Sequence, residues 1–418
     1  MLQGGTFSRI KEIIAGYRQD MIAMQRELVR RVAVGPDNRG PTAKVPGEAP
    51  KADYLARELR RLGLTVTDYP APDERVEGGH RPNLIALLPG SRRRTIWILS
   101  HLDVVPEGDR SLWRTDPFEL QVEGDLLYGR GVEDDHHGIV ASIFAVRALL
   151  EAGQEPAYTI GLALVSDEET GSQKGLAYLL AHHPELFSPQ DLIIVPDAGN
   201  PDGTLIEIAE KSMLWLRLEV QGRQCHASKP DLGVNTLRAS AHAIVALEAL
   251  GRKFNALEPF FDPPHSTFEP TKIEANVDNI NTIPGLGVFY LDCRVLPDYD
   301  LGQVRAKVRE IADEIEQRFG VAIKVTAMQE VQAPPATSAD APVVKALEAA
   351  VRAVYQRQAK PRGIGGGTVA AFFRRQGLPA AVWMSDNHTA HQPNEWVNIN
   401  TLIGDCQVLA HVFGQAGL

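Results

Sequence analysis

The sequence predicts an α/β protein in which helices flank a mixed, mostly parallel sheet, with a smaller α+β domain inserted into the chain. Three observations support this prediction. Short apolar runs alternate with amphipathic helical segments through the first half of the chain, as in a sheet covered by helices on both faces. Near Ser212 the pattern changes to alternating inward and outward residues, which is typical of a half-exposed antiparallel strand. After the proline-rich segment QAPPATSADAP the first pattern resumes.

The elements of the first domain follow from hydrophobic periodicity. From 7 to 31 apolar residues recur at helical spacing, so we expect one amphipathic helix there. The next elements, in order, are a helix near 51–62, strands at 83–88 and 95–100, a polar stretch at 106–131, a helix beginning near His137, a strand at 158–166, a helix at 174–181 and a strand at 191–195.

The inserted segment has the order β-α-β-β-α-β, which is the ferredoxin-like arrangement. Its elements are a strand at 213–222, a helix at 235–254, strands at 268–277 and 287–296, a helix at 301–319 and a strand at 322–331. The return segment supplies a helix at 342–356, a turn at 363–368, a helix at 369–376 and a strand at 379–384. A chain of 418 residues exceeds what one core usually holds. We therefore expect two domains, residues 1–212 with 333–418, and residues 213–332.

Composition narrows the class of protein. The formal net charge is −10, and Lys and Arg do not cluster beyond the short SRRRT turn, which argues against nucleic acid as a partner. An odd number of cysteines, Cys225, Cys293 and Cys406, argues against a disulfide framework. The N-terminus lacks the apolar core of a signal peptide, and no apolar run approaches the roughly 20 residues that span a bilayer. We expect a cytoplasmic protein with no membrane segment.

Histidine and acidic side chains follow the ends of the predicted buried strands. His101 follows TIWILS, the pair Glu168–Glu169 follows TIGLALVSD, Asp197 follows LIIVP, and His391 comes shortly after AAVWMS. Ligands of an open parallel sheet gather in the crevice at the carboxyl ends of its strands, so these side chains are expected to converge. Two imidazoles and several carboxylates in one crevice are typical of a divalent-metal site.

The same residues suit catalysis by two metal ions. Such ions need a bridging carboxylate, and the chain supplies an Asp for that place, together with one His and one further carboxylate for each ion. One glutamate of the pair 168–169 can bind metal while its neighbour takes a proton from water. Singly, each residue has an ordinary explanation: a strand-end His can be structural, a Glu pair can be solvated, and Asp197 can be a turn residue before Gly199. Their joint order predicts the metal site.

Five motifs resemble those of the M20 peptidases, the di-zinc amidohydrolases that include succinyl-diaminopimelate desuccinylase, acetylornithine deacetylase, aminoacylase and carboxypeptidase G. The motifs are SHLDVVPEGD, YGRGVEDDHHG, VSDEETGS, VPDAGN and AHQPNEWV. The resemblance covers the chain almost end to end and is closest to members known only as M20 metallo-hydrolases. It implies a zinc-peptidase-like catalytic domain with the inserted segment as a lid. The roles it implies are Asp134 as bridging ligand, His101 with Asp197 at one ion, Glu169 with His391 at the other, Glu168 as general base and Asp103 as the carboxylate that orients an imidazole.

One motif departs from the usual pattern of this family. The second motif commonly reads D-x-K-G, whereas here Asp134 is followed by Asp135, His136 and His137. These two histidines fall where the family begins a helix, so we do not expect them to be ligands. His388, three residues before His391, is expected to line the pocket and not to bind metal.

The segment QCHASKPDLGVNT resembles the lid motif of the family, in which a His reaches into the active site of a partner subunit. His226 would then donate a hydrogen bond to the oxyanion that forms when water adds to the amide carbonyl. Without the resemblance, His226 is a turn residue that caps the helix beginning near Asn235. Cys225 is interpreted as a small turn or buried residue and not as a nucleophile. Because the lid of this family often dimerises, a homodimer through residues 213–332 is expected.

Further residues match positions that contact the substrate in the desuccinylase branch. Asn281, in NVDNINTIPG, and Arg294, in YLDCRVLPD, would bind a carboxylate, for which an Arg fork is well suited. Arg294 is equally explained by a salt bridge on the surface of a strand. The turn GIGGGT precedes a helix, so that Gly366, Gly367 and Thr368 would hold the tail of the substrate. No GK[ST] follows this turn, as a nucleotide-binding P-loop requires.

The sequence therefore predicts a hydrolase of linear amide bonds in N-acyl amino acids, of the desuccinylase or deacetylase type. Its expected cofactors are two divalent ions, zinc first, with cobalt and manganese compatible with the same ligands. Water activated by the ions would attack the carbonyl, with Glu168 as general base. Two alternatives stay open: a carboxypeptidase-like exopeptidase or dipeptidase, and a non-catalytic binding protein on the same fold. A small acyl amino acid or a short peptide is the expected substrate.

Overall fold

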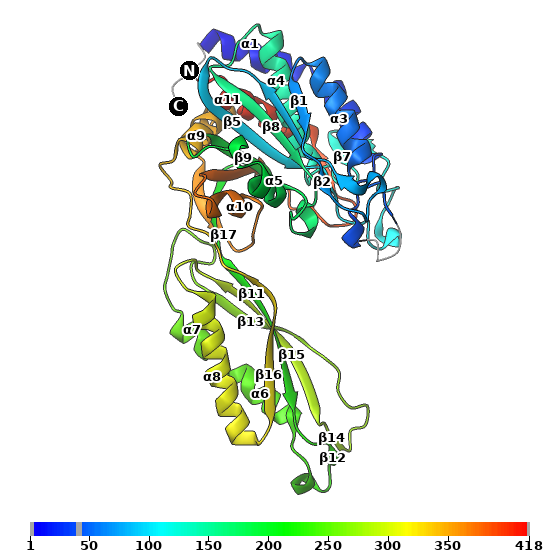
Figure 1. Ribbon diagram of the computed structural model, residues 1–418, viewed down its shortest axis with the longest axis vertical. Coiled ribbons are helices and arrows are strands. Elements are labelled where there is room, and N and C mark those ends of the chain that lie inside the picture. The colour runs from blue at the N-terminus through cyan, green and yellow to red at the C-terminus, as the bar shows by residue number, and fades with distance from the viewer. Residues whose placement is uncertain (1–3, 39–43, 416–418) are drawn as a thin grey trace. The chain divides into compact units, whose positions relative to one another are not determined.

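The computed structural model describes residues 4–38 and 44–415, and the chain divides into two compact units (Figure 1). Unit 1 comprises Met1–Ile208, Thr337–Pro361 and Thr368–Leu418, and unit 2 comprises Ala209–Ala336 and Arg362–Gly367. Most of the GIGGGT turn therefore groups with the inserted unit, although its last residue, Thr368, belongs to unit 1.

Unit 1 is built on an eight-stranded mixed sheet, which confirms the predicted fold class. The central strands β8, β5, β9 and β18 run parallel, and antiparallel strands flank them. The central strands are apolar and buried on both faces, because helices cover the sheet on both sides. In sheet order the strands are β1 (Thr65–Asp68), β4 (Leu84–Leu88), β8 (Tyr158–Val165), β5 (Arg92–His101), β9 (Leu192–Asn200), β18 (Ala380–Ser385), β10 (Leu205–Glu210) and β17 (Lys360–Ile364).

The helices of unit 1 form a layer on each face of this sheet. On one face α4, α9 and α11 pack against the strands and α11 packs against both α4 and α9, with α1 and α2 against α4. On the other face α5 and α10 enclose an apolar cluster around Trp97 and Phe187. The helices are α1 (Gly4–Ala15), α2 (Arg18–Val29), α3 (Ala49–Arg61), α4 (His136–Glu151), α5 (Leu176–His182), α9 (Pro342–Tyr355), α10 (Ala370–Arg375) and α11 (Ile399–Phe413).

Short strand pairings bring distant loops of unit 1 together. β7 (Leu126–Tyr128) pairs antiparallel with β6 (Gln121–Glu123) and with β19 (Trp396–Asn398). β2 (Ala71–Pro72) pairs with β3 (His80–Arg81). The pairing of β7 with β19 matters most for the site, because it places the chain that precedes Asp134 beside the chain that follows His391.

Unit 2 has the ferredoxin-like arrangement that the sequence predicts. Its antiparallel sheet has the order β13-β15-β11-β16, and α6 and α8 pack against it around one apolar core. Alternate residues of β11, from Leu214 to Val220, enter that core, as the period of two in the sequence indicates. The elements are β11 (Ser212–Gln221), α6 (Thr236–Ala246), α7 (Ala249–Lys253), β13 (Thr267–Ile273), β15 (Leu286–Val295), α8 (Leu301–Phe319), β16 (Ala322–Val331) and the short pair β12 (Cys225–His226) and β14 (Thr282–Ile283).

Two predicted helices are each two helices in the structure. The helix expected over 7–31 breaks at Gly16 and Tyr17, because glycine is a poor helix residue and the chain turns there into α2. The helix expected over 235–254 breaks between Ala246 and Ala249. The sequence prediction also missed α11, which is buried over most of its surface and so lacks the polar face that marks an amphipathic helix.

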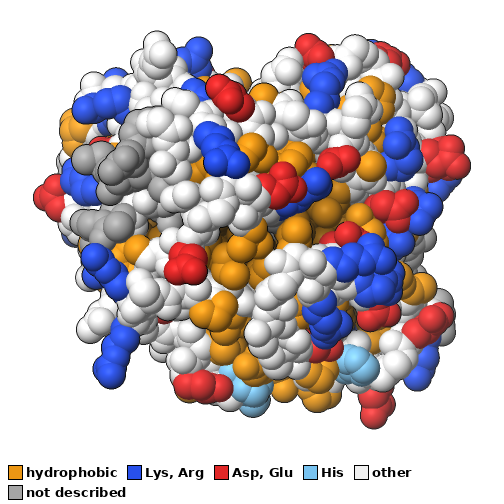
Figure 2. Space-filling view, turned by 90° about the horizontal axis from the view of Figure 1, so that it is seen from above, with side chains coloured by type: hydrophobic (Ala, Val, Ile, Leu, Met, Phe, Trp, Pro, Cys, Tyr) orange, Lys and Arg blue, Asp and Glu red, His pale blue; other side chains and the backbone are white. Residues whose placement is uncertain are grey.

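The surface in Figure 2 carries side chains of both charges, with Lys and Arg beside Asp and Glu around a band of apolar side chains. Exposed ion pairs such as Arg147–Asp20, at 2.7 Å, join elements of unit 1. Pairs of this kind contribute roughly 0–1 kcal/mol each, so the apolar core is the main source of stability. Within the part of the chain that the structure describes, every helix is too short or too polar to cross a membrane.

Candidate metal centre

The four central parallel strands of unit 1 each bring a predicted ligand to one edge of the sheet. His101 is the last residue of β5, and Asp197 lies in the second half of β9. Glu168 and Glu169 form a 3₁₀ turn directly after β8, and His391 lies in the loop after β18. Since parallel strands end at the same edge of a sheet, residues far apart in the sequence meet there.

Asp134 lies between the two imidazoles. Its Oδ1 is 2.7 Å from Nε2 of His101, and its Oδ2 is 2.9 Å from Nε2 of His391. The carboxylate therefore contacts one ring with each oxygen. This is the arrangement that a carboxylate shared by two metal ions requires.

Each imidazole has a second carboxylate beside it. Oδ1 of Asp197 lies 3.5 Å from Nε2 of His101, and Oε2 of Glu169 lies 3.0 Å from Nε2 of His391. The other oxygen of Glu169 is buried without a hydrogen-bond partner. A buried, unpartnered carboxylate oxygen is costly unless a cation binds it. Together with the nitrogen and oxygen donors, this atom shows that the residues present fit a divalent cation.

Asp135 also belongs to this cluster, a position that the sequence prediction did not assign. One group of potential ligand atoms consists of His101, Asp135 and Asp197. The carboxylate of Asp135 accepts hydrogen bonds from the N–H of His101 and from the N–H of Gly138, both at 3.1 Å. It thus caps the N-terminus of α4 and holds the end of β5. An Asp just before the start of a helix is a typical N-cap residue, so the predicted helix near His137 could have identified the structural role of Asp135.

The pKa values of the cluster reflect the mutual stabilisation of imidazoles and carboxylates. Burial would lower the pKa of His101, but the nearby carboxylates of Asp103, Asp134 and Asp197 outweigh burial and raise the pKa well above its usual value. The hydrogen bonds that His391 donates to Asp134 and then to Glu169 raise the pKa of its imidazole to about 10. Burial opposes ionisation of Asp134, yet the two imidazoles hold its pKa well below the usual range. The site therefore stabilises positive charge strongly, and a divalent cation supplies such charge.

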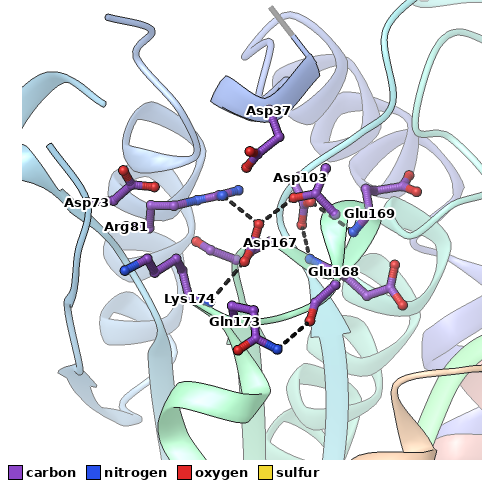
Figure 3. Close-up of polar contacts among 12 residues, drawn as sticks. Asp37, Asp73, Arg81, Asp103, Asp167, Glu168, Glu169, Gln173 and Lys174 are labelled. Carbon is purple, nitrogen blue, oxygen red and sulfur yellow. Dashed lines mark hydrogen bonds and ion pairs between the residues drawn. The ribbon is translucent and has the colours of Figure 1, made fainter. Parts of the chain in front are cut away.

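Glu168 is the acid of the cluster that contacts neither imidazole. Burial, reinforced by Asp197, raises the pKa of Glu168 well above its usual value. The backbone N–H groups of Glu168 and Glu169 donate to the two carboxylate oxygens of Asp103, at 3.0 and 3.1 Å. Figure 3 shows that the carboxylates of both glutamates extend away from Arg81, while their backbone faces Asp103.

The resemblance implies that the carboxylate of Asp103 orients an imidazole, but in the structure its main-chain oxygen makes the closer contact with His101. Nδ1 of His101 lies 3.0 Å from the main-chain oxygen of Asp103 and 3.6 Å from its carboxylate. The carbonyl group therefore orients the imidazole, and the carboxylate positions the glutamate turn.

A buried ion network supports the same turn from the opposite side. Arg81, which is fully buried, donates to Glu48 and, at 2.6 Å, to Oδ1 of Asp167. The other oxygen of Asp167 accepts from the N–H of Lys174 at 2.9 Å, as Figure 3 shows. Asp167 has φ of 66°, a left-handed conformation that needs such support. Arg81 and Glu48 could not be predicted from the sequence, because neither lies in a ligand motif.

Two glutamates tie the Asp134 loop and the His391 loop to each other. Glu133 accepts from the N–H groups of Asn387, Thr389 and Ala390, at 2.7, 2.6 and 3.1 Å. Glu395, from the other loop, accepts from the N–H groups of Gly131, Glu133 and Asp134, at 2.9, 2.9 and 3.2 Å, and pairs with Arg130. Burial raises the pKa of Glu395 to about 7. Each loop thus fixes the backbone of the other, and with it the contact between Asp134 and His391.

The other histidines near the motifs have different partners. His136 and His137 begin α4, where the resemblance implies a helix. Nε2 of His136 lies 2.7 Å from Nζ of Lys51, and Nε2 of His137 lies 2.9 Å from Oδ2 of Asp405. His388, which is exposed, pairs with Asp386 at 3.0 Å.

In unit 2 the predicted lid residues His226 and Asn281 are neighbours. His226 lies in β12, opposite Thr282, and the carbonyl of Asn281 accepts from the N–H of Ala227 at 2.8 Å. Nδ1 of His226 accepts from the N–H of Ser228 at 3.1 Å. Asn235 itself caps α6, so His226 does not fill that structural role.

Arg294 lies beside the glycine-rich turn within unit 2. Its Nε and Nη2 donate to the two oxygens of Asp292, at 2.7 and 3.1 Å, and its Nη1 donates to the carbonyl of Gly365 at 3.2 Å. The salt bridge considered as an alternative is therefore present. A side chain added at Gly366 would point into open space. One added at Gly367 would lie nearest to the side chains of Glu210 and Met213. Cys225 is a partly exposed free thiol.

Comparison with known proteins identifies the relatives of this chain. The model of peptidase family M20/M25/M40 matches residues 97–415. An uncharacterised metallohydrolase of Methanococcus maripaludis is 39% identical over 88% of this chain and 93% of its own length. Succinyl-diaminopimelate desuccinylase of Gluconacetobacter diazotrophicus is 29% identical over 93% of this chain and 95% of its own. Human carnosine dipeptidase 1 has the same fold, with a TM-score of 0.74 and 19% identity over 97% of this chain and 98% of that one.

The contacts between the two loops predict the effect of removing one charge. Glu133→Gln presents an amide N–H₂ to donors that now face a carboxylate, so the His391 loop should shift. We expect affinity for a divalent metal to fall roughly 10–100-fold, the usual effect of losing a group that orients a ligand. Elemental analysis after dialysis measures this. The exposed Glu123→Gln, on β6, is the matched control and should keep its metal. Equal metal content in both variants would contradict the role given to Glu133.

Proposed function

Because the chain belongs to peptidase family M20/M25/M40 and is a hydrolase of amide or peptide bonds, we propose that it cleaves the amide bond of N-acyl amino acids with the help of two divalent metal ions. The single observation that carries this proposal is the contact of Asp134 with both His101 and His391, each of which has a further carboxylate beside it. A carboxylate placed between two such ligand sets is what a two-ion site needs.

The proposed ligands form two sets that share Asp134. His101 and Asp197 would hold one ion, and Glu169 and His391 the other. When bound, the ions would supply an activated water and polarise the scissile carbonyl. Zinc is the proposed metal, since imidazole nitrogen and carboxylate oxygen are its usual catalytic ligands, and cobalt or manganese would bind the same groups.

Glu168 is proposed as the general base. It contacts neither imidazole, and the carboxylate of Asp103 fixes its backbone. Burial raises its pKa well above the usual value of a carboxyl group, which makes the carboxylate a better proton acceptor. In the reaction it would take a proton from water and pass that proton to the nitrogen of the leaving amine.

Residues of unit 2, together with Thr368 of unit 1, are proposed to bind the substrate. His226 accepts at Nδ1 from Ser228, so the proton of its neutral ring lies on Nε2 and can be donated to an oxyanion. Asn281 and Arg294 are proposed to recognise a carboxylate of the substrate, and Gly366, Gly367 and Thr368 to hold its tail. The hydroxyl of Thr368 lies 3.4 Å from Oε2 of Glu207.

The proposed substrate class is that of desuccinylases and deacetylases. It rests on the relationship, over nearly the whole chain, to succinyl-diaminopimelate desuccinylase. An exopeptidase or dipeptidase activity would use the same cluster, because an amide bond is cleaved in either case. A non-catalytic binding protein would have no need of Glu168.

We also propose a homodimer that forms through unit 2. Leu237, Ala241 and Val245 lie on one face of α6 at helical spacing, and Leu237 and Val245 are 49% and 62% exposed. Apolar side chains grouped on an exposed helix face are typical of a protein interface. The cytoplasm is the proposed compartment, because the three cysteines are free thiols.

Adjacent glutamates give a matched test of the proposed roles. Glu168→Gln should lower kcat roughly 10²–10⁴-fold, the usual contribution of a general base, while metal content stays unchanged. Glu169→Gln should instead lower metal content, because its oxygen lies beside His391. Turnover and elemental analysis on both variants measure the difference. A Glu168→Gln enzyme with wild-type turnover would refute the assignment of the base.

The substrate class is tested with a panel on metal-reconstituted protein. N-succinyl amino acids, N-acetyl amino acids and dipeptides are compared by kcat/KM, and we expect the acyl amino acids to be preferred. Cleavage of dipeptides alone would replace the proposal with a peptidase. If no substrate is cleaved and no metal is bound, the chain is a binding protein.

The proposed dimer is tested by placing charged side chains on the exposed apolar face of α6. The double variant Leu237→Glu, Val245→Glu should be a monomer in size-exclusion chromatography with light scattering, because burying two carboxylates at an apolar interface is costly. Leu257→Glu, at a residue of unit 2 that is 70% exposed and lies outside α6, is the control and should stay dimeric. A monomeric wild-type protein would rule out the proposal.

A further inference from the structure

Lys51, in the first turn of α3, carries an amine that lies buried beneath the metal cluster. The residue is 1% exposed, although lysine is rarely buried. Its Nζ lies 2.7 Å from the carbonyl oxygen of Leu102 and 2.7 Å from Nε2 of His136. The carbonyl oxygen of Leu102 accepts a hydrogen bond from the amine, and Nε2 of His136 accepts a second one in the tautomer that carries its proton on Nδ1. No ligand motif includes α3, and the proposed chemistry assigns nothing to this residue.

The two acceptors lie in different ligand loops. Leu102 stands between His101 and Asp103, in the turn at the end of β5. His136 follows Asp134 and Asp135 at the start of α4. The amine thus joins the turn that presents an imidazole to the segment that presents the shared carboxylate.

We infer that Lys51 is a positioning residue, whose amine holds the His101 turn and the start of α4 at the separation that the 2.7 Å contact between His101 and Asp134 requires. This inference rests on the proposed function, because it concerns the metal ligands. Asp134 is shared by both ligand sets, so a shift of α4 relative to His101 would weaken both.

The surroundings of the amine favour this role. Burial lowers the pKa of Lys51 to about 7, while Asp103, Glu48, Glu395 and Asp135 act in the opposite direction. Without the amine, the carbonyl of Leu102 and Nε2 of His136 would be buried acceptors with no donor. Such a group is costly to leave unpaired, and a shift of either loop towards water would relieve that cost.

The sequence offers a way to separate positioning from general stability. Position 136 of this chain is a His that starts α4, and the amine beside it comes from Lys51 on α3. The double variant Lys51→Met, His136→Lys returns an amine to the same buried site from the other element. Lys211 provides a control, because it is 3% exposed and its Nζ donates to the carbonyls of Pro263 and His265 within unit 2.

The experiment measures metal affinity by elemental analysis at buffered free zinc, together with the rise in Tm that zinc produces. Lys51→Met should bind zinc roughly 10–100-fold more weakly than wild type and should show a smaller zinc-induced rise in Tm. The double variant should recover to within roughly tenfold of wild type, as expected if the amine acts by orienting ligands. Lys211→Met should lower Tm without zinc but keep the affinity for zinc.

Two results would overturn the inference, and a third case is decided by the double variant. Wild-type zinc affinity in Lys51→Met overturns it, and so does an equal loss in Lys211→Met, which would show general destabilisation. If Lys51→Met is insoluble, the double variant decides: zinc binding supports the inference, and an insoluble or zinc-free double variant overturns it. A wild-type protein that binds no divalent metal would instead refute the proposed function, which keeps the two failures distinct.

Discussion

The concentration of carboxylates at one edge of the sheet is the constraint on which the rest of unit 1 depends. Asp134, Asp135, Glu168, Glu169 and Asp197 lie near one another, and within the described residues the imidazoles of His101 and His391 contact Asp134, Glu169 and Asp197. Two like charges 4 Å apart repel by about 4 kcal/mol at the effective dielectric of a protein. Without fixed backbones these side chains would move apart or take up protons. The raised pKa of Glu168 and the depressed pKa of Asp134 show the two ways in which the cluster accommodates its charge.

The structure meets this constraint by letting carboxylates from one ligand loop bind the backbone of another. Asp135 accepts from the N–H of His101, and Asp103 accepts from the N–H groups of Glu168 and Glu169. Glu133 and Glu395 do the same between the Asp134 and His391 loops. Each of these carboxylates gains donors that compensate its burial, and each donor belongs to a segment that presents a ligand. The buried carboxylates, whose repulsion would otherwise separate the ligand loops, therefore hold these loops together. Buried cations, namely Lys51, Arg81 and Arg130, complete the balance beneath the cluster.

The sequence was sufficient to predict the architecture and the convergence of histidine and acidic side chains at one edge of the sheet, because both depend on patterns that repeat along the chain. Apolar runs gave the parallel strands, and the position of His101, Glu169, Asp197 and His391 after those runs placed them at one edge. The supporting residues were not predictable in the same way. Glu133 and Glu395 look like any acid in a loop, and Arg81 and Lys51 look like ordinary surface cations until the fold buries them. Their roles depend on contacts between loops far apart in sequence. The break at Gly16 and the buried helix α11 were missed for a related reason, since packing decides them more than local pattern does.

In the proposed function, the reaction and the choice of substrate would depend on different parts of the chain. Every proposed metal ligand lies in unit 1, whereas His226, Asn281 and Arg294 lie in unit 2. A guanidinium has five N–H donors, and in Arg294 three of them already serve Asp292 and Gly365. A succinyl carboxylate would therefore compete with Asp292 for this fork, while an acetyl group makes no such demand. The proposed metal ligands would treat both acyl groups alike, because each presents the same amide carbonyl. Under the proposed function, the charge balance between Asp292 and Arg294, and not the metal cluster, would distinguish the two kinds of substrate.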